Sequence, residues 1–179
     1  MPTTIALLAS GRRNGNTGRL MDRIAGELQI EVVDLAEKSI SPFDYEHRNR
    51  NDDFEPLIRH VLGFDQIIFA SPVYWYAVAG PMKIFIDRIS DLLDVPELLE
   101  QGCALRGKTG HVVCTSIDDE VSAHFLGAFR DTFSYLEMEF GACMHANCKD
   151  GYMASKYEDD TRNFIERVRA CRSTMKHSY

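Results

Sequence analysis

The sequence predicts an α/β fold in which helices cover both faces of a parallel five-stranded sheet. Short apolar runs alternate along the chain with segments whose apolar residues recur at helical spacing. Strands that alternate with helices pair in parallel through right-handed crossovers. The near-continuous apolar character of the runs is typical of strands buried on both faces. The predicted strands are residues 5–9, 30–33, 67–70, 111–114 and 140–146.

The segments between these strands each carry one apolar stripe, which predicts five amphipathic helices. The stripes are Leu20, Met21, Ile24, Ala25 and Leu28; Leu57, Ile58, Val61 and Leu62; Met82, Phe85, Ile86, Ile89 and Leu93; Val121, Phe125, Phe129, Phe133 and Leu136; and Phe164, Ile165, Val168 and Met175. Neither an internal repeat nor an interdomain linker interrupts this order. We therefore expect residues 1–179 to form one domain of ordinary size, arranged as a doubly wound three-layer sandwich.

Composition narrows the range of partners and the location. Acidic residues outnumber basic ones by 27 to 20, and the net charge of -7 disfavours binding to nucleic acid. The sequence contains no apolar run near the roughly 18 residues that a membrane-spanning helix needs, so we expect no membrane partner. The first residues lack a basic region and a cleavage signal, which predicts a cytoplasmic protein.

The five cysteines and six histidines do not suggest a metal site. The cysteine count is odd, the spacing is irregular and no Cys-x-x-Cys occurs, so neither a disulfide framework nor a zinc site is expected. We expect buried free thiols in a reducing compartment. The histidines show no metal-ligand spacing either.

Eight small, polar or basic residues follow the first predicted strand and open the first predicted helix. Ligands bind at such carboxyl ends of parallel strands, and a helix N-terminus favours an anion. Two glycines allow close approach of the backbone, so a phosphate monoester is the expected guest. The plainer alternative is a turn capped by Thr17. The residues are Ser10, Gly11, Arg12, Arg13, Asn14, Gly15, Asn16 and Thr17.

An aromatic loop follows the third predicted strand at the same sheet edge. Tyr74, Trp75 and Tyr76 are adjacent and cannot all face the core, so with Pro72 and Val73 they suggest a flat π-ligand beside the phosphate site. Backbone groups of such a loop can hydrogen-bond the heteroatoms of a redox cofactor. The alternative is that the three aromatic residues form a subunit interface.

The remaining loops give weaker indications. After the fourth strand, Thr115 and Ser116 could donate to the ligand, whereas Asp118 or Asp119 is expected to cap the fourth helix. The loop of residues 36–53 is long and polar, which fits a role in substrate access or subunit contact or a merely variable segment. Asp52 or Asp53 is expected to cap the second helix.

Residues 102–109 match the nucleotide-binding pattern Gly-x-x-x-x-Gly-Lys-Thr letter for letter. That mechanism requires the order strand, loop, helix, so that a helix N-terminus faces the phosphates. Here the helix precedes the string and a strand follows it, so we expect a basic turn into the fourth strand rather than a nucleotide site.

Two segments together resemble the NAD(P)H-dependent FMN reductase and iron–sulfur flavoprotein group of the flavodoxin-like superfamily. Residues 9–17 resemble its phosphate loop Gly-Ser-Pro-Arg-Lys-x-Gly-Asn-Thr, and residues 71–88 resemble its flavin-ring loop and following helix. The resemblance implies a flavodoxin-like sheet of order 2-1-3-4-5. It also implies that Ser10, Arg12, Asn14, Gly15, Asn16 and Thr17 hold the FMN phosphate, and that the loop from Pro72 to Tyr76 borders the flavin ring.

The resemblance also implies a function. We expect hydride transfer from NAD(P)H through FMN to a quinone, a nitro or azo compound or free flavin, in a homodimer or homotetramer. The flavin carries the chemistry, so no catalytic side chain is named. The region that holds cluster cysteines in the iron–sulfur members reads Ser41-Pro42-Phe43-Asp44-Tyr45, which predicts no iron–sulfur cluster. The alternatives are a flavodoxin-type electron carrier or a non-catalytic relative that has lost FMN.

Overall fold

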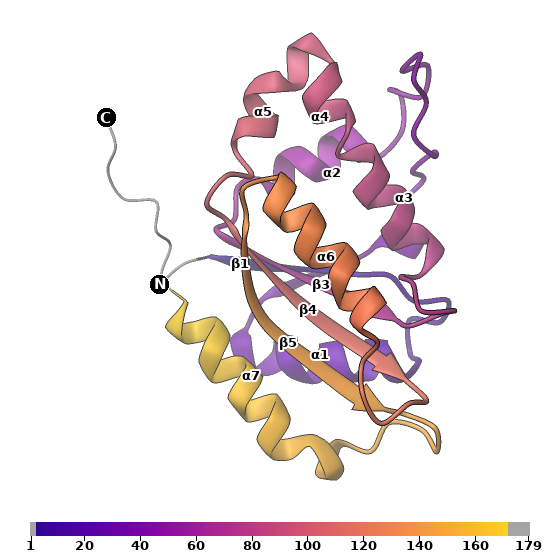
Figure 1. Ribbon diagram of the computed structural model, residues 1–179, viewed down its shortest axis with the longest axis vertical. Coiled ribbons are helices and arrows are strands. Elements are labelled where there is room, and N and C mark those ends of the chain that lie inside the picture. Colours follow the sequence, from indigo (N-terminus) through magenta and orange to yellow (C-terminus); the bar gives the residue numbers. More distant parts are fainter. Residues whose placement is uncertain (1–2, 172–179) are drawn as a thin grey trace.

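A five-stranded parallel sheet of order β2-β1-β3-β4-β5 forms the centre of the molecule (Figure 1). The computed structural model describes residues 3–171. The strands are β1 (Thr4–Leu8), β2 (Glu31–Asp34), β3 (Gln66–Pro72), β4 (Thr109–Ser116) and β5 (Glu139–Asn147). This topology confirms the predicted flavodoxin-like sheet, and each observed strand contains or overlaps its predicted run.

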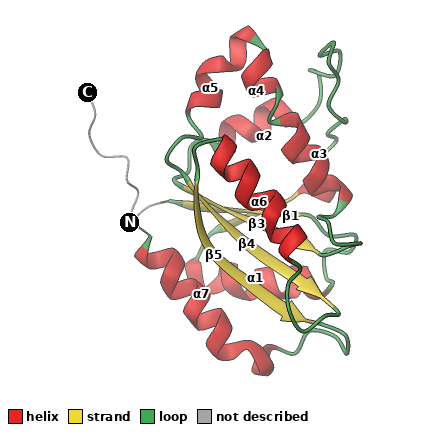
Figure 2. Ribbon diagram, viewed as in Figure 1, coloured by secondary structure: helices red, strands yellow, loops and turns green. Residues whose placement is uncertain are grey.

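Helices cover both faces of the sheet, as Figure 2 shows. The helices α1 (Asn16–Leu28) and α7 (Glu158–Ala170) pack on one face. The other face carries α2 (Phe54–Val61), α3 (Gly80–Arg88) and α6 (Ala123–Tyr135). The predicted apolar stripes supply the buried side of each helix; Met175 lies outside the described residues.

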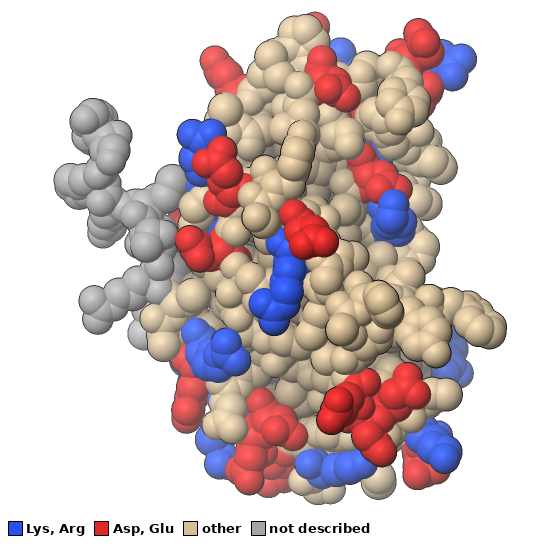
Figure 3. Space-filling view, in the orientation of Figure 1, with Lys and Arg blue, Asp and Glu red and all other residues tan. Residues whose placement is uncertain are grey.

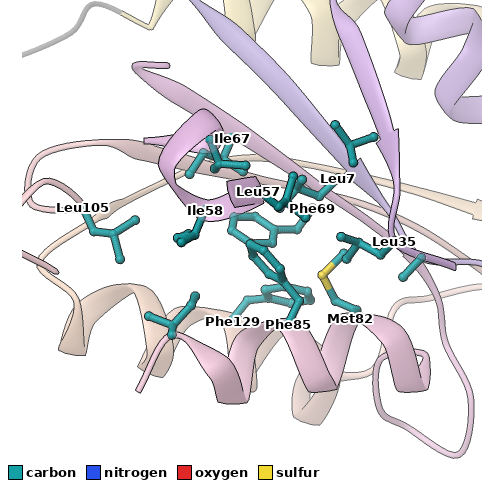
Figure 4. Packing of buried hydrophobic residues seen from close by; sticks show 14 of the residues in the cluster. Leu7, Leu35, Leu57, Ile58, Ile67, Phe69, Met82, Phe85, Leu105 and Phe129 are labelled. Carbon is teal, nitrogen blue, oxygen red and sulfur yellow. The ribbon is translucent and has the colours of Figure 1, made fainter. Parts of the chain in front are cut away.

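Figure 4 shows the apolar layer under α2, α3 and α6. Phe69 of β3 reaches the ring of Phe129 on α6, with centroids 5.8 Å apart, and Phe85 of α3 lies 5.7 Å from Phe54 of α2. These buried rings fix the helices against the centre of the sheet. The register aligns Leu8 of β1 with Ala70 of β3, so the loops that follow the two strands leave the same edge side by side.

The third apolar stripe predicts a helix that continues to Leu93. The observed helix α3 ends at Arg88, so the prediction was wrong beyond that residue. The chain turns after α3 and then forms α4 (Asp91–Asp94), a short 3-10 turn (Pro96–Leu98) and α5 (Leu99–Cys103). The amides of Ile89 and Ser90 bond to carbonyls three residues back, which tightens the last turn of α3. Leu92 still reaches the core, whereas Leu93 is exposed.

The buried guanidinium of Arg88 anchors the loop between β2 and α2. Its Nε donates to Asp91 Oδ2 at 2.7 Å, and its Nη1 donates to Asp52 and, at 3.1 Å, to the carbonyl of Ser41. Burial acts to raise the pKa of Asp52, but hydrogen bonds from Arg88 and from backbone amides outweigh it and leave that pKa lowered. Removing Arg88 would leave the carboxylates of Asp52 and Asp91 without their buried cationic partner.

The start of α2 partly follows expectation. Asp53 occupies the N-cap position, but its carboxylate accepts from the amide of Ser39 instead of from the helix. Asp52 Oδ1 accepts from the amide of Phe54 at 2.9 Å and so caps the first turn. Both aspartates therefore link the loop to the helix.

The nucleotide-like string of residues 102–109 lies where its chemistry cannot operate. Lys108 is buried, and its Nζ donates to the carbonyls of Leu62 and Phe64 at 2.9 and 2.7 Å. The string leads into the amino end of β4, at the sheet edge opposite to the loops that follow β1, β3 and β4. The ammonium group is therefore structural, as the element order predicted.

The cysteines follow the expectation only in part. All five are free thiols; Cys114 and Cys148 are buried, but Cys103 at the end of α5 is exposed, so the expectation of burial was wrong there. The described residues 3–171 include no group of three His, Cys, Asp or Glu placed to hold a metal ion. Within the same residues, no helix is long and apolar enough to cross a membrane.

Candidate functional site

A cavity of about 780 Å³ opens at the carboxyl edge of the sheet, between the loops that follow β1, β3 and β4. This volume is in the range of small-molecule and cofactor sites. Hydroxyls and backbone groups line one part, and three aromatic residues line the other. The lining residues are Ser10, Arg12, Gly15, Asn16, Thr17, Pro72, Val73, Tyr74, Trp75, Tyr76, Thr115, Ser116, Ile117, Asp118 and Cys148.

The first turn of α1 presents uncapped backbone donors to this cavity. Gly15 occupies the N-cap position without a side-chain bond, and the first turn contains no acidic residue. Arg19 makes the first intrahelical bond, to the carbonyl of Gly15, so the amides of Asn16, Thr17 and Gly18 lack acceptors within the helix. An anion is the natural partner for these donors and for the positive end of the helix dipole.

The two arginines of this loop have different environments. Both terminal nitrogens of Arg13 donate to the Asp22 carboxylate, and this hydrogen bond is the main cause of the raised pKa of Arg13. Arg12 lines the cavity, and within residues 3–171 its guanidinium forms no ion pair. Arg12 is therefore the arginine available to a phosphate.

Hydroxyl contacts hold the loop in shape. Ser10 Oγ donates to the carbonyl of Arg12 at 2.9 Å, and Thr17 Oγ1 lies 2.7 Å from Thr115 Oγ1. The two threonine hydroxyls carry two protons and the bond between them uses one, so the second can be donated to a ligand. Asn16 Oδ1 also accepts from the amide of Tyr152, which ties α1 to the chain beyond β5.

The aromatic loop after β3 forms a tight two-residue turn. Tyr74 and Ala77 exchange backbone hydrogen bonds at 2.9 and 3.0 Å, and Trp75 and Tyr76 between them have φ of 49° and 63°. Such left-handed backbone in two successive large residues is strained and usually requires Gly or Asn. Trp75 is 95% exposed, and the turn projects from the molecule as the uncharged protrusion at the right of Figure 3.

The turn also lies close to the loop that follows β1. A Cβ atom built on Gly11 would lie 3.9 Å from Tyr74 Oη. The strained turn thus holds its aromatic side chains beside the cavity, where they could contact a planar ligand.

The loop after β4 contributes more than was expected and caps no helix. Ser122 is the N-cap of α6, and its hydroxyl accepts from the amide of His124, so the expected capping by Asp118 or Asp119 was wrong. Asp118 and Ile117 line the cavity instead. Asp119 accepts from the side-chain amide of Asn147 at 2.8 Å.

The structure brings the predicted site residues together with one exception. Ser10, Arg12 and the residues from Gly15 to Thr17 share the cavity with the aromatic turn and with Thr115 and Ser116, whereas Asn14 is exposed and does not line it. Sequence reasoning missed Ile117, Asp118 and Cys148 as lining residues. Cys148 directly follows β5, so the rule that ligands bind beyond the carboxyl ends of strands would have indicated it.

These features fit FMN, which combines a phosphate monoester with a planar ring system. The uncapped amides of α1 suit the phosphate, as does the guanidinium of Arg12, which has no ion-pair partner within residues 3–171. The aromatic turn suits the ring. Residues 2–143 match the family model described as NADPH-dependent FMN reductase. The chain belongs to the NADPH-dependent FMN reductase family. The resemblance noted in residues 9–17 and 71–88 is thereby confirmed.

Individual relatives agree with this family. YwqN of Bacillus subtilis (strain 168), which is named as an NAD(P)H-dependent FMN-containing oxidoreductase, is 28% identical over 145 residues, which cover 76% of this chain and 80% of YwqN. An iron–sulfur flavoprotein of Archaeoglobus fulgidus is 32% identical over 97 residues, which cover 48% of this chain and 44% of that protein.

A solved structure agrees on the fold alone. An FMN-dependent NADH-azoreductase from Bacillus anthracis, solved in complex with FMN, superposes with a TM-score of 0.68 at 10% identity and covers 92% of this chain and 96% of that one. Together with the family match, it places this chain among the flavin oxidoreductases of flavodoxin-like fold.

Proposed function

We propose that this member of the NADPH-dependent FMN reductase family binds FMN in the cavity and passes hydride from NAD(P)H to a small acceptor. The observation that carries the proposal is the pairing of two unlike groups in one cavity. The anion-binding first turn of α1 lies at one part and the aromatic turn at the other. The flavin, when bound, accepts hydride and returns electrons to the acceptor.

Each part of the chain has a distinct task in this proposal. Arg12 and the amides of Asn16 and Thr17 hold the phosphate, and Thr17 Oγ1 donates to one of its oxygens; Ser10 joins them by turning its proton from the Arg12 carbonyl to the phosphate. Asn14 is expected to join them only if its exposed side chain turns towards the phosphate. Ser116 donates to the ring or to the ribityl chain, and Thr115 does so in place of Thr17 when it is Thr17 that donates to Thr115. Pro72 and Val73 border the ring.

The acceptor is expected to be planar and uncharged. The side chains of Tyr74, Trp75 and Tyr76 form an exposed apolar surface at the cavity mouth, which suits a quinone, a nitro or azo aromatic compound or free flavin. The name of the structurally similar azoreductase supports this class of acceptor. We do not expect an iron–sulfur cluster or another metal to take part.

A second copy of the chain is the expected protein partner. Trp75 and Ile117 are exposed apolar side chains beside the cavity, and such a patch is typical of an interface. We therefore propose a homodimer or homotetramer, in the cytoplasm, with no nucleic acid or membrane partner. Sedimentation of the FMN-loaded protein tests this: a monomer at micromolar concentration contradicts the interface.

Anaerobic stopped-flow mixing tests the activity. The FMN-loaded protein is mixed with NADH and with NADPH while flavin absorbance is followed, and the reduced protein is then mixed with a quinone or azo dye. We expect bleaching by at least one nicotinamide and recolouring by the acceptor. A flavin that neither nicotinamide reduces would favour a flavodoxin-type carrier, and a protein that takes up no FMN would be a relative without cofactor.

A further inference from the structure

One pair of side chains links the candidate flavin cavity to a second hollow. Ser116, the last residue of β4, lines the cavity, and His145 of β5 lines a hollow of about 300 Å³ between β5 and α7. Ser116 Oγ and His145 Nε2 are 2.8 Å apart. A titratable group that faces one hollow is thus hydrogen-bonded to a hydroxyl that faces the other.

The bonds around Ser116 Oγ leave room for His145 to be the donor in this contact. The oxygen accepts from the amide of Asp118 at 3.1 Å, and its proton has only a long bond of 3.3 Å to the Asp118 carbonyl. If His145 holds its proton on Nε2, Oγ accepts from the imidazole as well, which uses both lone pairs. The hydroxyl proton is then free to turn from the carbonyl into the cavity.

The surroundings of His145 allow the ring to exchange protons with water. The side chain is half-buried and opens into the hollow, so Nδ1 is the nitrogen left for solvent. Burial lowers the pKa of His145, and the nearby Asp118 carboxylate partly offsets this. The other titratable groups that line the hollow are Asp119, Cys143, Tyr157, Asp160 and Arg167.

The proposed reaction needs a proton that hydride transfer does not deliver. NAD(P)H gives one hydride, whereas a quinone takes up two electrons and two protons, so each turnover draws one proton from water. We propose that His145 and Ser116 relay this proton from the hollow beside α7 into the cavity. The inference rests on the proposed function; it gives Ser116 a second task beside its proposed contact with the ligand, and it gives His145 a first one.

The relay balances without any further reactant. A proton from water bonds to Nδ1 of His145 while the Nε2–H bond breaks and its proton bonds to Ser116 Oγ. The original O–H bond of Ser116 breaks as its proton passes to the acceptor oxygen, which has gained the electron pair. The imidazole ends neutral with its proton on Nδ1, and exchange with water restores the starting tautomer. The pair itself is neither oxidised nor reduced.

The test compares an acceptor that takes up protons with one that does not. A benzoquinone requires protons on reduction, whereas ferricyanide takes one electron and no proton. The variant is His145→Gln, because a glutamine amide can still donate to Ser116 but cannot shuttle a proton. The matched control is His124→Gln, an exposed position in the first turn of α6 that lines neither hollow.

We expect His145→Gln to lower kcat with benzoquinone by at least about ten-fold near pH 7, within the usual contribution of proton transfer catalysis. The kcat with ferricyanide should stay within about two-fold of wild type, as should the FMN dissociation constant. The solvent deuterium isotope effect on the quinone reaction should change in His145→Gln and stay as in wild type in His124→Gln.

A readout without turnover accompanies the kinetics. Nitrogen NMR of the apoprotein should find the proton of neutral His145 on Nε2, and Ser116→Ala should shift that resonance. Equal losses with both acceptors, no loss with either, or a proton on Nδ1 would overturn the relay. Wild-type protein that oxidises NAD(P)H with neither acceptor would instead overturn the proposed function, and the relay with it.

Discussion

The hydroxyl oxygens of Thr17 and Thr115 lie 2.7 Å apart and join the first turn of α1 to the end of β4. Both side chains are buried at the cavity wall, so the contact fixes the first turn of α1, the proposed phosphate site, relative to the loop that follows β4. Two segments that are 98 residues apart in the chain thereby form one wall of the cavity.

Thr17→Val keeps the shape of the side chain but removes its hydroxyl. We expect FMN affinity to fall about ten-fold, because a hydrogen bond to the ligand is lost and Thr115 keeps an unpaired buried oxygen. Fluorescence titration of the apoprotein with FMN measures this. Thr132→Val on α6, outside the cavity, is the control; an unchanged affinity in Thr17→Val would place the phosphate elsewhere.

Gly18 is required by close packing inside α1. A Cβ atom at this position would lie 1.8 Å from the carbonyl oxygen of Arg13, so Gly18→Ala must push the phosphate loop aside. We expect it to destabilise the fold by about 1–3 kcal/mol, as overpacking does, and to weaken FMN binding.

The same helix supplies the matched control for this prediction. A Cβ at Gly26 meets nothing within 4 Å, so Gly26→Ala should stabilise the protein by up to about 1 kcal/mol through helix propensity. Urea denaturation with FMN titration measures both variants. Equal behaviour of the two alanine variants would contradict the close contact at Gly18.

The strained turn at Trp75 and Tyr76 predicts opposite effects on stability and function. Replacing Trp75 by Asn and Tyr76 by Gly supplies residues that tolerate the left-handed backbone, so the free energy of unfolding should rise by about 1–3 kcal/mol. The KM for a quinone should rise about ten-fold, because the aromatic surface is lost. Thermal unfolding and steady-state kinetics measure the two effects.

Tyr45→Asn is the control for the turn, because Tyr45 is an exposed aromatic residue that does not line the cavity. It should leave KM unchanged. A double variant of the turn that loses stability would mean that the aromatic side chains support the fold rather than the site.

The buried imidazole of His111 makes the free energy of unfolding depend on pH. Its Nδ1 accepts from the amide of Ala142 at 2.9 Å, so the proton lies on Nε2, which donates to Gln66 Oε1 at 2.7 Å. Burial, with a smaller effect of the positive charge on Arg167, lowers the pKa of His111 from 6.5 to about 4.

The unfolded chain therefore binds a proton at this histidine between pH 6.5 and about 4, and the folded chain does not. The stabilisation is complete above pH 6.5 and is lost as the pH falls towards 4, by about 3 kcal/mol in total. Proton NMR titration of the imidazole measures the folded pKa. A His111 imidazole that titrates near 6.5 in the folded protein would contradict the buried neutral ring.

Most of the fold follows from local patterns in the sequence. The apolar runs located all five strands because parallel strands are buried on both faces. Their ends were less certain: β4 extends to Thr109 and Ser116 because pairing with neighbouring strands, and not apolar character, decides where it begins and ends. The break after Arg88 depends on contacts of its guanidinium with a distant loop, which no local pattern contains.

The candidate site was predictable where topology determines it. Ser10 and Thr17 follow β1, and Thr115 lies at the carboxyl end of β4, so their convergence at one sheet edge could be expected. The role of Gly18 could not, because a glycine in a helix looks merely unfavourable until the Arg13 carbonyl is seen against it. The left-handed turn at Trp75 was also hidden, since large aromatic residues rarely adopt that backbone.

We expect the first turn of α1 to hold the phosphate of FMN while the aromatic turn borders its ring. Titration of the apoprotein with FMN and with riboflavin, which lacks the phosphate, tests it most directly. We expect FMN to bind at least about 100-fold more tightly, since charge-assisted hydrogen bonds to Arg12 and the helix amides contribute roughly 3 kcal/mol. Equal affinity for the two ligands, or binding of neither, would contradict the account.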